Sequence, residues 1–194
     1  MLTPPTHGGS LYRVMGIDPG TDTLGVGLVS IDLETQAITL TDGLTLTAHQ
    51  QLVHSESLIE VLGYRHTRLL KLSEALKRCI GHIQPHAIIC EAPYLGRFPQ
   101  AYGALVECLA MIRSVVFAYD PGLMLHTIDP ASAKAALGVS GQSQQKLDVR
   151  EALVNHPRLQ PHVDFNQLDE HAFDALLVAC YHVQSLGFSF IEAR

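Results

Sequence analysis

The stretch LYRVMGIDPGTDTLGVGLVSI, residues 11–31, contains two β-rich runs separated by a short polar turn. Residues 11–17 are apolar and lead into the turn sequence Asp-Pro-Gly, and residues 24–31 resume a β-type composition. Turn residues between two such runs predict a hairpin of strands. The turn would place the Asp18 carboxylate at the end of the first strand, at an edge of the sheet and not between strands.

The rest of the sequence predicts a mixed α/β fold around this hairpin. Leucine and isoleucine at even spacing over about residues 36–46 indicate a third strand. Three antiparallel strands followed by alternating helices and strands give a five-stranded mixed sheet flanked by helices. The later elements are expected as an amphipathic helix over 64–83, a buried strand over 86–90, a long helix over 99–119, a strand over 123–128, a short helix from Pro130 through Leu137, a helix carrying Lys146 and Arg150, and a final helix over about 167–186.

The composition is that of one folded domain. The chain has 194 residues, of which 47% are hydrophobic and 16% charged, which argues against disorder. We expect a single domain over 11–186, a flexible N-terminal tail over 1–10 and a C-terminal tail over 187–194. The first residues have neither a basic start nor an apolar stretch, so no signal peptide is expected. The four cysteines show no paired spacing, which suits a reducing compartment and predicts a cytoplasmic protein.

Charge is distributed unevenly along the chain. The net charge is −6, which by itself disfavours a nucleic-acid partner. Residues 1–62, however, contain one basic and seven acidic residues, whereas residues 63–158 contain eleven basic and seven acidic residues, a local surplus of four positive charges. A positive middle segment can bind a phosphate backbone, although solvated helix faces would give the same pattern.

Four residues are candidates for chemistry because of their places in the predicted elements. Asp18 and Glu91 each end an apolar strand, and a carboxylate at such a position needs a partner or a metal. His171 and Asp174 are three residues apart and project from one face of the final helix. Each signal has an ordinary alternative, since Asp-Pro-Gly is a common turn and a polar pair on a helix can be simply solvated. Two strand ends and one helix edge together favour a divalent-metal-dependent nuclease site.

Four segments of the chain resemble a known family when taken in order. They are MGIDPGTDTLGVGLV, EAPYLGR, IDPASAKAALGVSGQSQQKLDV and HAFDALLVA. Together they resemble the RuvC family of Holliday junction resolvases, from about residue 12 to 182 and most weakly over 32–62. The resemblance implies a ribonuclease H-like fold and an endodeoxyribonuclease that resolves four-way junctions. It implies paired nicks that leave a 5′-phosphate and a 3′-hydroxyl.

The resemblance also implies a cofactor and its ligands. Asp18, Glu91 and Asp174 match acidic ligands around a pair of Mg²⁺ ions, for which Mn²⁺ can substitute. Carboxylates suit this task because they are hard oxygen donors that leave coordination positions for water and phosphate. His171 stands where many relatives have an aspartate. It would either take a metal position through one ring nitrogen or polarise the attacking water, and both roles stay open.

Five residues are expected to contact DNA. Tyr94 occupies a position where the family has an aromatic residue that enters the junction centre, and stacking on an unpaired base would favour branched DNA. The alternative is that Tyr94 packs under its own loop. Lys134 and Lys146 match family lysines that contact the backbone near the scissile phosphate, and Arg97 and Arg150 could extend this track. Such contacts position DNA without reading its sequence.

The expected helix over 99–119 is the most apolar part of the chain. Its residues 104–118 are interrupted by Glu107 and Arg113 and are too short to span a bilayer, so no membrane role is expected. The helix has more apolar area than one sheet face requires. A four-way junction has two strands to cut symmetrically, so we expect this helix to form the contact of a homodimer, as the resemblance also implies.

Three other functions compete with this interpretation. A YqgF-type ribonuclease H-like nuclease shares the opening strand turn and acts on RNA, but Lys134, Lys146 and the glycine-bearing loop favour the resolvase. An actin-like ATPase or sugar kinase would need a second nucleotide-binding half that 194 residues cannot supply. An inactive DNA-binding module would be expected to lose acidic ligands, whereas all four positions here can bind metal.

Overall fold

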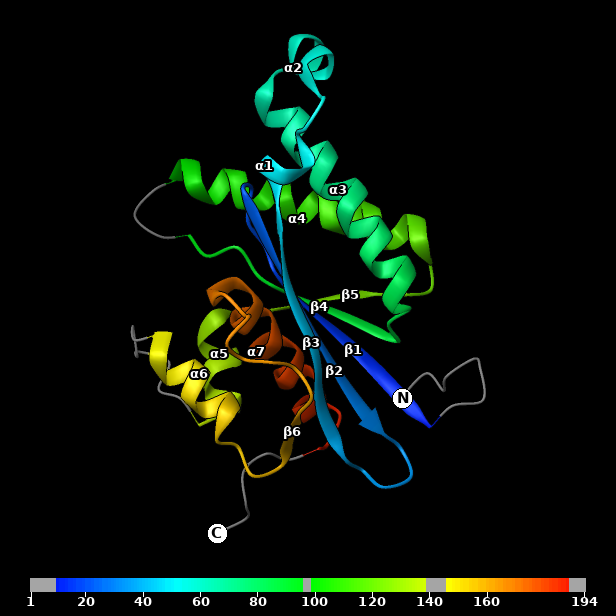
Figure 1. Cartoon of the computed structure of the whole chain (residues 1–194), viewed down its shortest axis with the longest axis vertical. Helices are drawn as coiled ribbons and strands as arrows, with labels where there is room; N and C mark the ends of the chain where they lie inside the picture. Colours follow the sequence, from blue (N-terminus) through cyan, green and yellow to red (C-terminus); the bar gives the residue numbers. More distant parts are fainter. Residues whose placement is uncertain (1–9, 96–98, 139–145, 189–194) are drawn as a thin grey trace.

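The fold is built on one mixed sheet of six strands, in a computed structural model that describes residues 10–95, 99–138 and 146–188. The strand order is β5-β4-β1-β2-β3-β6 (Figure 1). The first three strands are antiparallel, β4 and β5 run parallel to β1, and β6 runs parallel to β3. The strands are β1 (Leu11–Asp18), β2 (Thr23–Asp32), β3 (Ile38–Thr47), β4 (Ala87–Glu91), β5 (Leu125–Ile128) and β6 (Leu159–Pro161).

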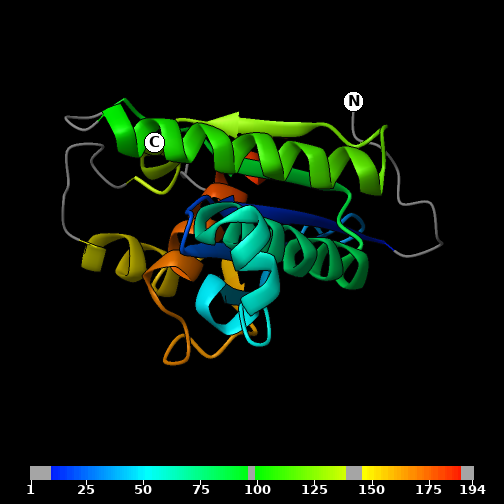
Figure 2. The same ribbon diagram turned by 90° about the horizontal axis from the view of Figure 1, so that it is seen from above.

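Helices cover both faces of this sheet. Apolar residues of α3 and α4 share one buried cluster with the sheet, and residues of α5, α6 and α7 share a second cluster with its other face. Figure 2 shows α4 lying lengthwise at one side of the molecule. The helices are α1 (Ala48–Gln51), α2 (Glu56–Leu62), α3 (Tyr64–Ile83), α4 (Pro99–Tyr119), α5 (Pro130–Ala136), α6 (Lys146–Val154) and α7 (Glu170–Ser185).

The α/β class and the order of the main elements are confirmed, but the predicted count of five strands is wrong. The sixth strand, β6, has only three residues and one buried position, which is too short for an alternating pattern to show. Helices α1 and α2 were not predicted either, because α2 has no buried residue and hence no apolar stripe. Of the two predicted tails, residues 1–9 and 189–194 lie outside the described residues.

The final helix begins at Glu170 and not near residue 167. The side chain of Asp169 accepts a hydrogen bond from the Ala172 backbone N–H at 3.0 Å and so caps the helix. The Thr45 hydroxyl of β3 also donates to the Asp169 carboxylate. The first turn of α7 is thereby attached to the sheet.

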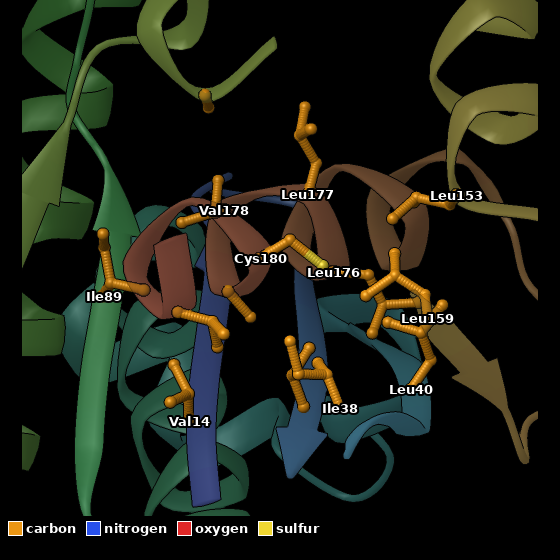
Figure 3. Close-up of a cluster of buried hydrophobic side chains, with 14 of the residues drawn as sticks. Val14, Ile38, Leu40, Ile89, Leu153, Leu159, Leu176, Leu177, Val178 and Cys180 are labelled. Atoms are coloured by element: carbon orange, nitrogen blue, oxygen red, sulfur yellow. The ribbon is translucent and has the colours of Figure 1, made fainter. Parts of the chain in front are cut away.

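Helix α7 lies directly on the hairpin of β1 and β2. Alternate residues of a strand face opposite sides of the sheet, so Val14 and Gly16 face α7 while Met15 and Ile17 face α3 and α4. A Cβ atom on Gly16 would be 2.0 Å from the Ala175 carbonyl oxygen, so glycine is what permits this close approach. Figure 3 shows Leu176, Leu177, Val178 and Cys180 of α7 in the resulting core.

Helix α4 is long and apolar enough to cross a membrane by length and composition. Among the described residues it is the one helix of this kind: an 18-residue window has a mean hydropathy of 1.6, and 28% of it is buried. The helix has the predicted bounds, Pro99–Tyr119, and the apolar run over 104–118 lies inside it. Core helices pass the same test, and α4 packs one face against the sheet and α3.

Candidate active site

The candidate site forms where the ends of two neighbouring strands meet the start of α7. Strands β1 and β4 are parallel neighbours in which Ile17 pairs with Cys90. Asp18 and Glu91 are the next residues in each strand, so both carboxylates lie at the same edge of the sheet. His171 and Asp174 come from the first turns of α7, which packs across this end of the hairpin. The topology therefore brings all four predicted residues to one place.

The ring of His171 bonds to both ends of the β1–β2 turn. Its Nδ1 is 2.7 Å from Asp18 Oδ2, and its Nε2 is 2.9 Å from Thr23 Oγ1. The side chain of Asp18 is 15% exposed and that of His171 is 34% exposed, so both remain reachable from solvent. This geometry holds the His171 ring between the two ends of the turn.

The carboxyl group of Glu91 is buried close to other negative charges. Its burial, together with the negative charges of Asp18 and Asp174, raises the pKa of Glu91 to about 7, while the positive charge of Lys134 acts in the opposite direction. Three carboxylates therefore share a confined region in which the nearby positive charge does not offset their repulsion. A site of this kind gains stability when a cation binds.

The donor set fits a divalent cation, although the side chains stand hydrogen-bonded to one another. In the described part of the chain, no group of three or more His, Cys, Asp or Glu side chains is gathered so that it could hold a metal ion as it stands. Asp18 and His171 instead bind each other. Carboxylate oxygens are the donors that Mg²⁺ prefers, and the crowded negative charge at Glu91 is what such an ion would neutralise. Asp18, Glu91 and Asp174 are the residues that fit the role, with His171 beside them.

The residues predicted to contact DNA differ in their exposure and in their contacts within the chain. Tyr94 follows β4 and is 73% exposed, so it does not pack under its own loop. Lys134 lies on α5 and acts electrostatically on Glu91. The guanidinium of Arg150 is occupied within the chain, since it donates to the Phe165 carbonyl at 3.3 Å and lies over the Phe173 ring.

The side chains of two predicted DNA-contacting residues lie outside the part of the chain that the structure describes. Arg97 lies outside the described residues. Lys146 begins α6, but its side chain is also outside them.

Sequence reasoning missed Thr23 as part of this site. A threonine at the start of a strand is ordinary β-type composition and carries no signal by itself. Thr23 is two residues before Gly25 and four before Gly27, so all three share the face of β2 that meets α7. That alternation was the available signal.

The sheet order, with helices on both faces and carboxylates at the ends of β1 and β4, defines a ribonuclease H-like fold. The chain is similar in sequence to proteins named RuvC crossover junction endodeoxyribonuclease. It is 26% identical over 176 residues to RuvC of Chloroflexus aurantiacus, covering 88% of this chain and 92% of that one. No protein-family model matches the chain.

Two solved structures share the fold. Thermus thermophilus RuvC in complex with a Holliday junction substrate matches with a TM-score of 0.63 at 20% identity, over 91% of this chain and 98% of that one. The yeast mitochondrial Holliday junction resolvase Ydc2 matches with a TM-score of 0.64 at 15% identity, over 93% of this chain and 80% of that one. At these identities the two structures support the fold alone.

Proposed function

We propose that this chain is a structure-selective endodeoxyribonuclease that resolves four-way Holliday junctions. The observation that carries the proposal is the gathering of Asp18, Glu91, His171 and Asp174 at one edge of a ribonuclease H-like sheet. The reaction would be hydrolysis of a phosphodiester by paired nicks that leave a 5′-phosphate and a 3′-hydroxyl. Homology to enzymes named crossover junction endodeoxyribonucleases supports the substrate class.

The chain's own residues would bind the cofactor and orient the scissile phosphate. Asp18, Glu91 and Asp174, with His171, would hold two Mg²⁺ ions, for which Mn²⁺ would substitute. When bound, the ions supply Lewis-acid polarisation of the phosphate and a water of lowered pKa. Lys134, whose charge already acts on Glu91, is placed to offset the charge of a bound phosphate.

Tyr94 and the basic residues around the site would select branched DNA. The exposed ring of Tyr94 can stack on an unpaired base, which would favour branched DNA over a linear duplex. Lys134 would contact the DNA backbone, and Arg97 and Lys146 are predicted to do the same. We leave Arg150 out of this set because its guanidinium is engaged with Phe165 and Phe173.

A second copy of the chain would supply the second active site. Phe117 on α4 is 67% exposed, and together with Met124 it lines an open groove of about 640 Å³ between the end of α4 and β5. We propose that this apolar surface forms the contact of a homodimer, with its two-fold axis matched to the two cuts in a junction. The same proposal places the enzyme in the cytoplasm, where it would meet DNA.

The test compares cleavage of three labelled DNAs in the presence of Mg²⁺: a four-way junction, a Y-shaped branch and a linear duplex. We expect the junction to be cut and Asp174→Asn to lose cleavage by a factor of about a thousand, as when a group that stabilises transition-state charge is removed. The matched control is Asp120→Asn, which makes the same change in the loop between α4 and β5, before the start of β5 and not after the end of a strand. It should cut as the wild type does.

Two results would contradict the proposal in different ways. Cleavage of linear duplex or RNA as readily as the junction would rule out the resolvase activity. Full cleavage by Asp174→Asn would show that the acidic cluster is not the active site.

A further inference from the structure

Thr23 lies against the ring of His171 on the side away from Asp18. Thr23 Oγ1 is 2.9 Å from His171 Nε2, and His171 Nδ1 is 2.7 Å from Asp18 Oδ2. Both ring nitrogens are therefore engaged at once, one at each end of the β1–β2 turn. The proposed function gives Thr23 no role, yet it is a direct polar partner of a candidate catalytic residue.

The Asp18 carboxylate fixes the direction of one hydrogen bond, and the neutral form of the ring fixes the direction of the other. A carboxylate only accepts, so Nδ1 of His171 carries the hydrogen that it donates to Asp18. In a neutral imidazole the other nitrogen then has a lone pair, and the Thr23 hydroxyl donates to it. The two bonds together select one tautomer. They also oppose a half-turn flip of the ring, which would put carbon atoms opposite both partners.

The register of the hairpin brings the ring to this position. Asp18 of β1 pairs with Gly25 of β2, and Thr23 precedes Gly25 by two residues on the same face. A Cβ atom on Gly25 would be 2.1 Å from the His171 carbonyl oxygen and 3.1 Å from its Cβ atom. Because residue 25 is glycine, α7 can start close enough to the strands for the ring to reach Thr23.

The helix itself is held independently of Thr23. Asp169 caps α7 by accepting from the Ala172 N–H and from the Thr45 hydroxyl. The Thr23 hydroxyl therefore adds a restraint on the ring and not on the helix. Removing that hydroxyl should release the ring while leaving the first turn of α7 in place.

We propose that Thr23 is a positioning residue that holds His171 with Nδ1 protonated and with the lone pair on Nε2. The lone pair on Nε2 accepts from Thr23 in the metal-free protein, and it is available to a water molecule or a cation when the Thr23 hydroxyl turns away. The catalytic consequence rests on the proposed function. The state of the ring is a property of the metal-free protein and can be measured without any activity.

The test uses Thr23→Val, which keeps the shape and removes the hydroxyl, and Thr23→Ser, which keeps the hydroxyl. Thr41→Val is the matched control, since the exposed Thr41 of β3 also donates to a side chain, Ser30 Oγ, at 2.9 Å. Imidazole ¹⁵N spectra of the metal-free proteins report the tautomer, and His171→Asn identifies the His171 signals. We expect the Nδ1-protonated form in wild type, Thr23→Ser and Thr41→Val, and a mixture of tautomers in Thr23→Val.

Cleavage of the four-way junction gives the second readout. We expect Thr23→Val to lower kcat by about tenfold with the KM for the junction unchanged, as for the loss of one orienting hydrogen bond. Thr23→Ser should restore kcat to near the wild-type value, and Thr41→Val should not change it.

Three outcomes separate the possibilities. A Thr23→Val protein with the wild-type tautomer and the wild-type kcat would overturn the proposal. A loss of kcat that Thr23→Ser does not restore would also overturn it, because the methyl group and not the hydroxyl would then matter. If the wild type cuts no junction but Thr23→Val shifts the tautomer, the proposed function fails while the positioning of the ring by Thr23 stands.

Discussion

The two long apolar helices, α4 and α7, lie on opposite faces of the sheet and use their apolar residues differently. In α7, 10 of 16 residues are buried, whereas in α4 only 5 of 21 are buried. The sheet and two further helices enclose α7, while Phe117 of α4 stays 67% exposed. The apolar residues of α7 serve the fold of one chain, whereas the exposed apolar residues of α4 are the ones that we propose for the homodimer contact. Two of the four candidate catalytic side chains, His171 and Asp174, are thus carried by the more deeply buried of these two helices.

The largest expected effect comes from a methyl group placed under α7. Gly16→Ala would bring a Cβ atom to 2.0 Å from the Ala175 carbonyl oxygen and 2.7 Å from the Ala179 nitrogen. Both neighbours are backbone atoms, so the helix has to move away from the sheet. We expect the free energy of unfolding to fall by more than about 3 kcal/mol, beyond the usual overpacking penalty, with loss of junction cleavage. Urea denaturation followed by circular dichroism measures this, and wild-type stability would contradict the close packing.

Truncation of one apolar residue on each helix tests the contrast directly. Leu176→Ala on α7 removes a fully buried side chain and should lower the free energy of unfolding by about 3 kcal/mol. Phe117→Ala on α4 removes an exposed side chain and should change the free energy of unfolding of the monomer by less than about 0.5 kcal/mol. Phe117→Ala should instead weaken self-association, measured by sedimentation equilibrium. Equal losses of monomer stability would show that α4 is a core helix like α7.

The buried side chain of His182 on α7 should make the free energy of unfolding depend on pH. Burial of His182, together with the charge of His126, lowers its pKa to about 4. The unfolded chain binds this proton near pH 6.5 and the folded chain does not, so stability is complete above pH 6.5 and is lost as the pH falls toward 4. Between these values the free energy of unfolding should fall by about 1.4 kcal/mol per pH unit from this group.

The His182 prediction is checked by denaturation at pH 7, 6 and 5 for wild type and His182→Gln. The difference between the two slopes isolates this residue from the other histidines. Identical slopes would mean that His182 protonates as easily in the folded chain as in the unfolded one.

The smallest expected effect is a gain on α4. A Cβ atom on Gly103 would meet nothing within 4 Å, and the residue lies inside the helix. Gly103→Ala should therefore raise the free energy of unfolding by about 0.5–1 kcal/mol, the difference in helix propensity. The change from glycine to alanine thus has opposite effects on the free energy of unfolding at the two positions. At Gly16 the added methyl group meets the backbone of α7, whereas at Gly103 it meets nothing within 4 Å. A destabilising Gly103→Ala would show that a second chain packs closely at that point.

The four site residues were accessible from the sequence because each has a positional signal. Asp18 and Glu91 end apolar strands, and parallel strand ends meet at one edge, while His171 and Asp174 share a helix face by their spacing. Thr23 had a weaker one, its alternation with Gly25 and Gly27, because its contact with His171 depends on the distance between β2 and α7. Arg150 looked like a surface cation but lies over an aromatic ring that sequence spacing does not bring near it.

The parts of the fold that escaped prediction are those with little buried apolar area. The periodic spacing of apolar residues in a sequence reflects burial, so α3 and the two strands of the hairpin could be predicted from it. Helix α2 buries none of its residues and projects at one end of the molecule (Figure 1). Its existence depends on backbone geometry and local hydrogen bonds, which leave no apolar pattern to read.

The short strand β6 has a consequence for how the protein behaves at high concentration. It pairs with β3 through residues 159–161 and ends at Pro161, which has no N–H to offer. β6 covers Ile38–Leu40, the first three residues of the ten-residue strand β3, whose backbone groups would otherwise lie open along that stretch. A further strand could pair along this stretch only with β6, where Pro161 lacks a donor. These three residues therefore limit strand-to-strand aggregation at the start of β3 while adding little to the core.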